Sequence, residues 1–370
     1  MTKSRILYAA SLLAAIFFLI FYIGYFSMFL LLFLLCVPLC TFFLLLPAYR
    51  NFSAVLAAPE KPVCCGEAAV FSLTAQCRSR IPTGTVCAKI LCRNTLTGET
   101  FWHRVRLSPI QGKSALELPI ISPYCGKLEV TVTRLTVCDL FGIFSLRYHL
   151  PEIAAACFVL PKIPEFLIPF SPKADMGNKT DEYDLYHPGN DLSELFAVRE
   201  YRPGDSPHSI HWKLTEKRGI LMVRQGSLPL PAGPDILVEL QEESSPTALS
   251  CAAETALALS SAMLSQGRQH HVLWLGGTEL QSCAVRDEDS TVQMTAWLLS
   301  AHPQKQAAAF AAYSTASDQQ LLYVTSAVPA VSLPEATVTF CCAPIETNAG
   351  SNLIAVTPGH IEEALQGLTL

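Results

Sequence analysis

Residues 199–213, with the sequence REYRPGDSPHSIHWK, place carboxylates, histidines, serines, a tryptophan and a lysine within fifteen positions. Asp205 and His211 are a carboxylate and an imidazole, the two groups that general acid–base catalysis most often uses. A hydrolase that uses this pair is therefore one hypothesis. Neither Ser206 nor Ser209 lies in a nucleophile elbow, so a catalytic constellation would lack its nucleophile.

Two binding chemistries are also open in this stretch. His208 and His211 lie three positions apart and could share one helical face, but a metal site needs at least one further ligand. Basic residues alternate here with Tyr201 and Trp212, a pattern typical of single-strand nucleic-acid binding. These basic residues are Arg199, Arg202, Lys213, Lys217 and Arg218. Acids lie among them and the net charge of the chain is −5, so we do not expect nucleic-acid binding. A lone His-x-x-His is a weak signal, so we do not expect a metal either.

Turn chemistry offers a structural interpretation of the same residues. The sequence Tyr-x-Pro-Gly occurs at 186–189 and again at 201–204, and an amide or acid follows each copy. Proline at the first central position and glycine at the second predict two type II turns. Asp205 would then face its own segment, so we expect it to bind backbone N–H groups, Arg199 or Lys213.

The residues after the second turn permit two structures. Ser206 followed by Pro207 is typical of a helix start, whereas Ile210, Trp212 and Leu214 alternate as in a strand. In either case we expect Trp212 and Ile210 to be buried against the domain that follows, with Trp212 as a hydrophobic anchor.

The elements that hold this stretch begin with a long apolar segment. Residues 6–46 are almost continuously apolar, and as one helix they would reach about 60 Å, twice the thickness of a hydrocarbon core. We therefore predict a hairpin of two transmembrane helices that reverses near residues 22–27, with Pro38 inside the second helix. A secretory signal peptide has a much shorter apolar region.

Basic residues flank both ends of this hairpin, and none lies at its tip. Lys3 and Arg5 precede it, Arg50 and Lys61 follow it, and its tip carries no charge. The positive-inside rule therefore predicts a two-pass protein of the cell (plasma) membrane with both ends and the soluble region in the cytoplasm. Fourteen cysteines without a disulfide-like spacing agree with a reducing compartment.

After the hairpin, hydrophobic periodicity predicts a multi-domain chain. Residues 51–150 contain short alternating strands, which predict a β-sandwich-like domain. Residues 151–230 read as a proline-rich linker and the stretch described above. Residues 231–370 alternate buried-type strands with helices, which predicts a doubly wound α/β domain. Residues 1–50 are the transmembrane helical hairpin.

The stretch also resembles a known signature. REYRPGDSPHSIHWK, followed by RGILMVRQ, strongly resembles the signature of the bacterial DUF58 family, and residues 199–225 are called the signature segment below. The matching positions are Arg199, Tyr201, Pro203, Gly204, Asp205, Ile210, Trp212 and Lys213, and a following strand carries Arg224. CDLFGIFSL upstream is similar to the family's DPFGLF segment. His208 and Glu216 depart from the pattern, where arginine and a small residue are usual.

The resemblance implies that residues 231–370 are a von Willebrand factor A-like domain. The metal site of such a domain takes Asp-x-Ser-x-Ser at the end of its first strand, because hydroxyl-rich loops offer oxygen ligands to Mg²⁺. This chain has Glu239, Gln241 and Glu243 at those positions. We therefore expect the metal site to be degenerate and no metal or other cofactor to be bound.

The resemblance also implies partners. Members of the family are often encoded beside MoxR-type AAA+ ATPases and transglutaminase-like membrane proteins. We therefore expect a non-enzymatic scaffold or adaptor that works at the lipid bilayer with a MoxR-type AAA+ ATPase, and with a transglutaminase-like membrane protein as a second partner. The alternative is the hydrolase that uses Asp205 and His211.

Overall fold

The chain divides into two compact units, Met1–Pro161 and Lys162–Leu370. The computed structural model describes a defined set of residues within them. These are residues 2–22, 24–79, 84–108, 112–149, 153–163, 167, 169, 179–189, 191–231, 233–277, 279–305, 309–314, 321–329, 337–344 and 353–365.

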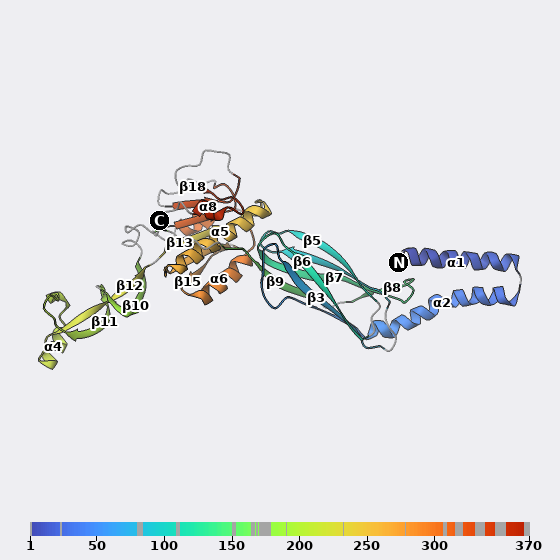
Figure 1. Cartoon of the computed structure of the whole chain (residues 1–370), viewed down its shortest axis with the longest axis horizontal. Coiled ribbons are helices and arrows are strands. Elements are labelled where there is room, and N and C mark those ends of the chain that lie inside the picture. The colour runs from blue at the N-terminus through green and yellow to red at the C-terminus, as the bar shows by residue number, and fades with distance from the viewer. Residues whose placement is uncertain are drawn as a thin grey trace. The chain divides into compact units, whose positions relative to one another are not determined.

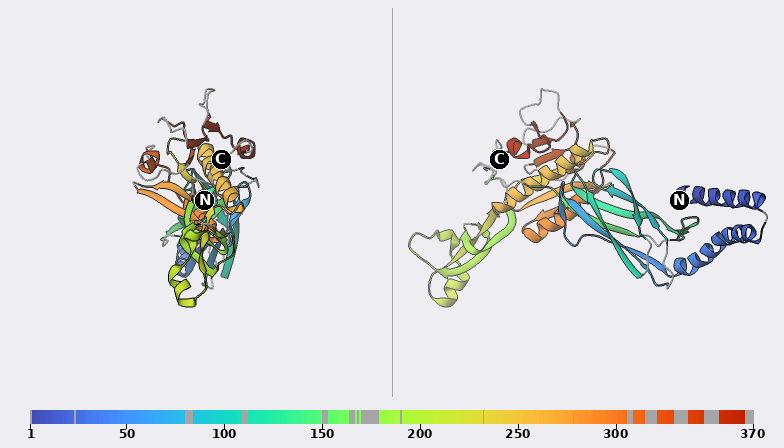
Figure 2. Two further views of the ribbon diagram at one scale, coloured as in Figure 1. Left: turned by 90° about the vertical axis from the view of Figure 1, so that its left-hand side faces the viewer. Right: turned by 45° about the vertical axis from the view of Figure 1, so that its right-hand side comes forward.

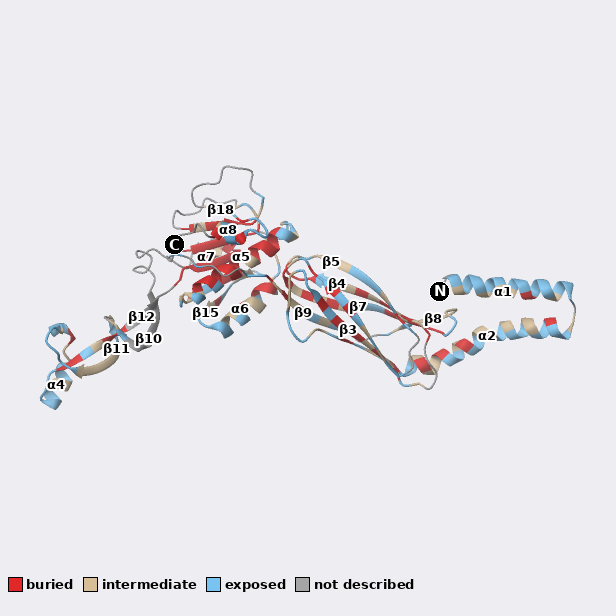
Figure 3. Cartoon of the chain, viewed as in Figure 1, coloured by how far each residue is buried: buried red, intermediate tan, exposed pale blue. Residues whose placement is uncertain are grey.

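Two apolar helices open the first unit, α1 (Thr2–Phe21) and α2 (Tyr25–Arg50) (Figure 1). The predicted reversal lies between them, where Gly24 is the N-cap of α2. The Ser27 hydroxyl donates to the Tyr22 carbonyl (2.6 Å) and accepts from the Gly24 N–H (3.3 Å), so it supplies partners to the backbone at the reversal. Both helices are long and apolar enough to span a membrane. Most of their side chains are exposed (Figure 3), which suits a hydrocarbon surrounding.

Two β-sheets make up the rest of the first unit. One is antiparallel and has the order β1 (Phe52–Ala57), β3 (Ala68–Cys77) and β6 (Gly112–Ile121). The other has the order β2 (Val63–Cys64), β9 (Ala154–Leu160), β7 (Gly126–Cys138), β4 (Val86–Asn94) and β5 (Thr100–Leu107), and β8 (Ser145–Tyr148) pairs with β7.

Residues from both sheets share one hydrophobic core. The predicted alternation is present in β3, where every second side chain is buried, and Phe71 and Leu73 are fully covered. Ile90 on β4 and Leu128 on β7 belong to the same cluster. Burying each such side chain contributes roughly 1.5–3 kcal/mol, so this cluster holds the two sheets together. The first unit includes β9 and therefore extends beyond residue 150, where the sequence placed the start of the linker.

The second unit contains a six-stranded sheet. Its strand order is β15 (Glu279–Val285), β14 (His270–Gly276), β13 (Asp235–Glu239), β16 (Leu321–Thr325), β17 (Thr337–Cys341) and β18 (Leu353–Ala355). All pairs are parallel except β14 with β15. Every residue of β13 is buried, which confirms the buried strand expected after residue 234. The edge strand β15 is not expected from the sequence.

Helices accompany this sheet, and the longest is α5 (Pro246–Ser265). The others are α6 (Glu288–Leu299), α7 (Ala309–Ser314) and α8 (Ile361–Leu365). α5 is also apolar enough to cross a membrane, but fourteen of its twenty residues are buried within the unit. In both views of Figure 2, α5 lies along the strands, so its apolar surface is used in packing.

A separate three-stranded sheet holds the signature segment. Its order is β10 (Lys179–Gly189), β12 (Met222–Pro231) and β11 (Asp191–Glu200), and β12 runs antiparallel to both neighbours. The sequence predicted a linker here and a type II turn at 186–189. Pro188 and Gly189 instead pair with Ser227 and Gly226 of β12, so the first Pro-Gly belongs to a strand.

Gly226 lies at a close approach between β12 and the start of β11. A Cβ atom there would overlap the backbone carbonyl of Asp191, and backbone atoms cannot move aside as a side chain can. We expect Gly226→Ala to lower the stability of this sheet by about 1–3 kcal/mol. Amide exchange checks this, with β13 as the internal reference. Wild-type protection of β11 and β12 in the variant would contradict the expectation.

Candidate functional site

Residues 201–221 connect β11 to β12 and are called the tip below; α4 (Trp212–Arg218) lies at this end of the sheet in Figure 1. The tip opens with the second Pro-Gly turn. The Asp205 N–H donates to the Arg202 carbonyl (3.0 Å), and Gly204 has φ +110°, which glycine adopts readily. The turn predicted around Pro203 and Gly204 is therefore present, at residues 202–205.

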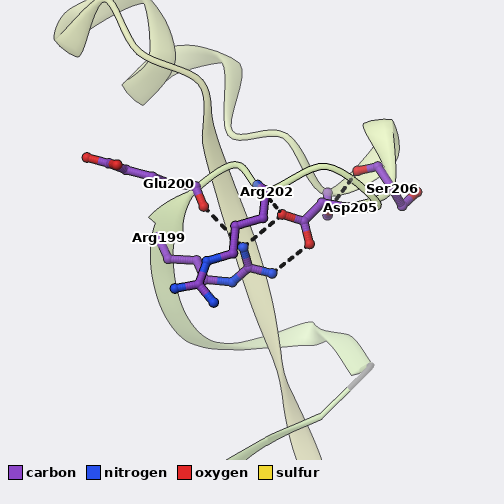
Figure 4. Close-up of polar contacts among 6 residues, drawn as sticks. Arg199, Glu200, Arg202, Asp205 and Ser206 are labelled. Carbon is purple, nitrogen blue, oxygen red and sulfur yellow. Dashed lines mark hydrogen bonds and ion pairs between the residues drawn. The ribbon is translucent and has the colours of Figure 1, made fainter.

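The Asp205 carboxylate is held by two arginines (Figure 4). The guanidinium of Arg199 donates to both of its oxygens, at 2.8 and 2.6 Å, and the backbone N–H of Arg202 donates to Oδ2 at 2.8 Å. Arg199 also donates to the Glu200 carbonyl (3.1 Å). This bidentate pair confirms that Asp205 binds Arg199 and a backbone N–H, and it fixes the turn to the end of β11.

These contacts change the protonation of the pair. Hydrogen bonding from Arg199 is the main cause that lowers the pKa of Asp205 to about 2, followed by the Arg202 backbone N–H. The same hydrogen bond raises the pKa of Arg199. The carboxylate is therefore held in its charged form and serves as an acceptor for its own segment.

The depressed pKa gives a pH dependence with a definite sign. In the unfolded chain Asp205 titrates at about 3.9, so its contribution to stability is complete above about pH 5 and is lost as pH falls through about 2. We expect the NMR shift of the Arg202 amide to stay constant down to about pH 3 in the wild type and to titrate below it. Asp205→Asn should abolish that titration. A midpoint near 4 would contradict the pairing.

Two short helical segments complete the tip. Ser206 caps a 3₁₀ helix, η1 (Pro207–Ser209), by accepting from the His208 N–H. α4 (Trp212–Arg218) follows, and its N-cap is His211, whose Nδ1 accepts from the Leu214 N–H at 3.3 Å. The helix ends at Gly219, whose φ is +70°. Of the two structures that the sequence left open, the chain therefore adopts the helix.

The structure does not join Asp205 and His211 into an acid–base pair. The Asp205 oxygens accept from Arg199 and Arg202, and His211 Nδ1 accepts from Leu214. Within the described part of the chain, no hydrogen bond connects the two residues. His208 is exposed, and among the described residues no group of three or more His, Cys, Asp or Glu side chains is arranged to hold a metal ion.

Trp212 corrects a prediction from the sequence. Its residue surface is 66% exposed, and Ile210 is only partly buried, in a β-bridge with Val223. Trp212 begins α4, whose partly buried side is formed by Leu214 and Thr215. We expected Trp212 to be a buried anchor in either structure, but α4 is partly buried at Leu214 and Thr215 instead and leaves the tryptophan exposed.

The remaining signature residues are exposed, on the tip and on β12. Tyr201 is 36% exposed, and Pro203, Gly204 and Lys213 are exposed. Arg224 is an exposed residue of β12 that pairs with Val198 across the sheet. The segment therefore has a bonded centre at Arg199 and Asp205 and an exposed aromatic and basic rim.

The positions expected to form a degenerate metal site lie at the carboxyl end of β13. Glu239 is buried and accepts from the Tyr323 hydroxyl (2.6 Å) and the Gln241 side-chain amide (3.1 Å), whereas Glu243 is exposed. The backbone N–H of Gln241 donates to the Ser326 hydroxyl (2.9 Å). The sequence pattern identified Glu239 and Gln241 but gave no signal for Tyr323 or Ser326, which come from β16 and the residue after it.

A cavity of about 630 Å³ lies elsewhere in the second unit. Trp274 and Trp297 form part of its wall, with ring centroids 6.3 Å apart, and Gln281 and His302 also line it. No sequence motif pointed to this cavity, and none of the signature residues line it.

Comparisons with known proteins leave the family of the chain open. No protein-family model matches it, and no curated protein does. The CARDB domain of a Pyrococcus furiosus protein is 12% identical over 30% of this chain and 90% of its own (TM-score 0.21). The DNA glycosylase AlkC of Pseudomonas fluorescens is 13% identical over 35% and 38% (0.20), and the bacterial hydrophobin BslA is 14% identical over 30% and 97% (0.19). TM-scores this low carry no argument about fold or function.

Proposed function

We propose that this chain is a membrane-anchored, non-enzymatic adaptor of the DUF58 type that faces the cytoplasm and binds a MoxR-type AAA+ ATPase through its tip. In this proposal α1 and α2 are the transmembrane anchor, and the two sheets of the first unit form a β-sandwich. The six-stranded sheet with its helices is a von Willebrand factor A-like domain without its metal ion.

One observation carries the proposal: Trp212 is exposed at the tip, whereas Asp205, which could otherwise act in catalysis, is paired with Arg199. The Asp205 carboxylate accepts hydrogen bonds from Arg199 and Arg202, so its role is to hold the turn in shape. Trp212, in contrast, leaves two thirds of its surface open. Covering that surface would contribute about 3 kcal/mol, which makes it a strong anchor for a partner.

Further observations support an interaction role. The apolar helix pair supplies a membrane anchor. At the carboxyl end of β13, the buried Glu239 accepts from two protein side chains, so its oxygens have partners without an ion. These features favour an anchored scaffold that presents a binding surface.

The proposal is tested by purifying the full chain from native membranes in mild detergent. We expect the MoxR-type ATPase of the same cell to be enriched with the wild-type chain, and the enrichment to be lost with Trp212→Ala. Recovery of the ATPase with equal yield from the variant would contradict the tip as its binding site. Absence of the ATPase from the wild-type preparation would contradict the partner.

A further inference from the structure

The outward face of α4 combines one aromatic ring with cations. Leu214 and Thr215 are partly buried, and the Thr215 hydroxyl accepts from the Met222 N–H (3.0 Å), so this side of the helix faces β12. Trp212, Lys213 and Lys217 are exposed. Lys213 and Lys217 are four positions apart and therefore lie on one helical face.

The segment is locally basic although the chain is acidic. Residues 199–224 contain six Arg or Lys and three Asp or Glu, whereas the whole chain has a net charge of −5. Asp205 is already paired with Arg199. Among the described residues, Lys213, Lys217 and Arg218 form no ion pair, so the tip presents three cations that are not bonded to an acid.

Apolar side chains adjoin these cations. Ile220 and Leu221 are 46% and 44% exposed. The Tyr201 N–H donates to the Leu221 carbonyl (2.9 Å), and the His211 N–H donates to the Met222 carbonyl (2.8 Å). Tyr201 and the N-cap of α4 are therefore bonded to consecutive residues at the start of β12, so these aromatic and aliphatic residues lie at the same end of the sheet.

We propose that the tip binds an acidic protein surface with an apolar recess that receives Trp212; this inference rests on the proposed adaptor function and names the chemistry of the partner. Covering Trp212 brings Lys213 and Lys217 into the interface. Opposite a neutral or basic surface they would be desolvated without partners, which costs free energy. Opposite carboxylates they pair, and the charges also steer the encounter.

The exposed carboxylate of Glu216 makes a protein a better partner for the tip than other anionic surfaces. It is exposed in the same helix, between the two lysines. A membrane or a nucleic acid presents a dense array of phosphates that would repel this carboxylate. A protein surface can place an amide, hydroxyl or basic group opposite it while keeping acids opposite the lysines.

The test replaces Ile220 with the photo-crosslinker p-benzoylphenylalanine in the full chain in living cells, which leaves Trp212 and the cations in place. We expect a crosslink to a protein, at a surface where Asp and Glu outnumber Lys and Arg. A crosslink to lipid, nucleic acid, a second copy of this chain or a protein surface without an acidic excess would overturn the inference. So would the absence of any crosslink.

Charge reversal supplies the second arm. Lys213→Glu with Lys217→Glu should reduce the crosslink yield at least tenfold, while Lys305→Glu, an exposed cation outside the tip, should leave it unchanged. Equal yields from the double variant and the control would overturn the inference. The identity of the captured protein is a separate result. Capture of another protein through an acidic surface would contradict only the ATPase proposal. Capture of the ATPase through a surface that is not acidic would contradict only the inference.

Discussion

Replacing Trp212 with alanine is expected to weaken binding of the ATPase by about 30-fold or more, while the free energy of unfolding changes by less than about 0.5 kcal/mol. Exposed side chains without specific contacts contribute little to stability, and Trp212 is 66% exposed. Trp212 is expected to contribute to binding instead, because a tryptophan at the centre of an interface is a typical hot spot, with at least ~2 kcal/mol of binding free energy lost on truncation. The same substitution in a buried anchor would instead cost about 3–5 kcal/mol of stability.

The measurement is a binding titration of the full chain in detergent or nanodiscs, beside denaturant unfolding of the same samples. Trp297→Ala is the matched control because Trp297 is also partly exposed, at 47%, but lies in α6 beside Trp274. We expect the control to bind as the wild type does. A large loss of stability in Trp212→Ala, or equal binding losses in both variants, would contradict the account of the tip.

Tyr323→Phe is expected to lower the free energy of unfolding of the second unit by about 3 kcal/mol. Tyr323 and Glu239 are each 3% exposed, and the hydroxyl donates to the carboxylate at 2.6 Å. Burial, reinforced by the Glu239 charge, raises the pKa of Tyr323, so the hydroxyl keeps the proton that it donates. Removing it leaves Gln241 as the remaining side-chain donor to a buried carboxylate, and such losses are costly for a charged acceptor.

Tyr313→Phe is the matched control for this variant. The Tyr313 hydroxyl also donates to a carboxylate, Asp235 Oδ2, but over a longer distance of 3.1 Å. Asp235 also keeps a contact with His271 Nδ1 (3.3 Å), and hydrogen bonding to Asp235 raises the pKa of His271, which favours the cationic partner. We therefore expect a smaller loss from Tyr313→Phe by denaturant unfolding. Millimolar Mg²⁺ should leave the unfolding midpoints of the wild type and Tyr323→Phe unchanged. A saturable rise in either would show that an ion binds at this end of the sheet.

The elements that the sequence predicted well are those whose burial is determined by local composition. The strand at Asp235–Glu239 has an apolar centre, Ile-Leu-Val, and the helix at Pro246–Ser265 is rich in Ala and Leu, so their burial could be predicted from the local sequence. The helical reversal near Gly24 follows from the length of the apolar run. The turn at 202–205 follows from Pro203 and Gly204 alone. The bond from the Arg202 N–H to Asp205 follows from the position of Asp205 directly after them.

The structural features that the sequence did not predict depend on contacts between distant residues. β10 and β11 are rich in polar residues, and their pairing with β12 has register shifts that no local pattern indicates. The exposure of Trp212 depends on whether its segment is a helix or a strand, and on which side of it meets β12. Tyr323 reaches Glu239 across two parallel strands that are separated by more than eighty residues.

Amide hydrogen exchange of the full chain, with and without the ATPase, tests most directly that the tip is the docking element. We expect the partner to slow exchange in residues 201–221, above all in α4 and the Ile220–Leu221 backbone, while the carboxyl ends of β13 and β14 stay unchanged. Slowed exchange around the cavity lined by Trp274 and Trp297, with the tip unaffected, would contradict the account and move the binding surface there.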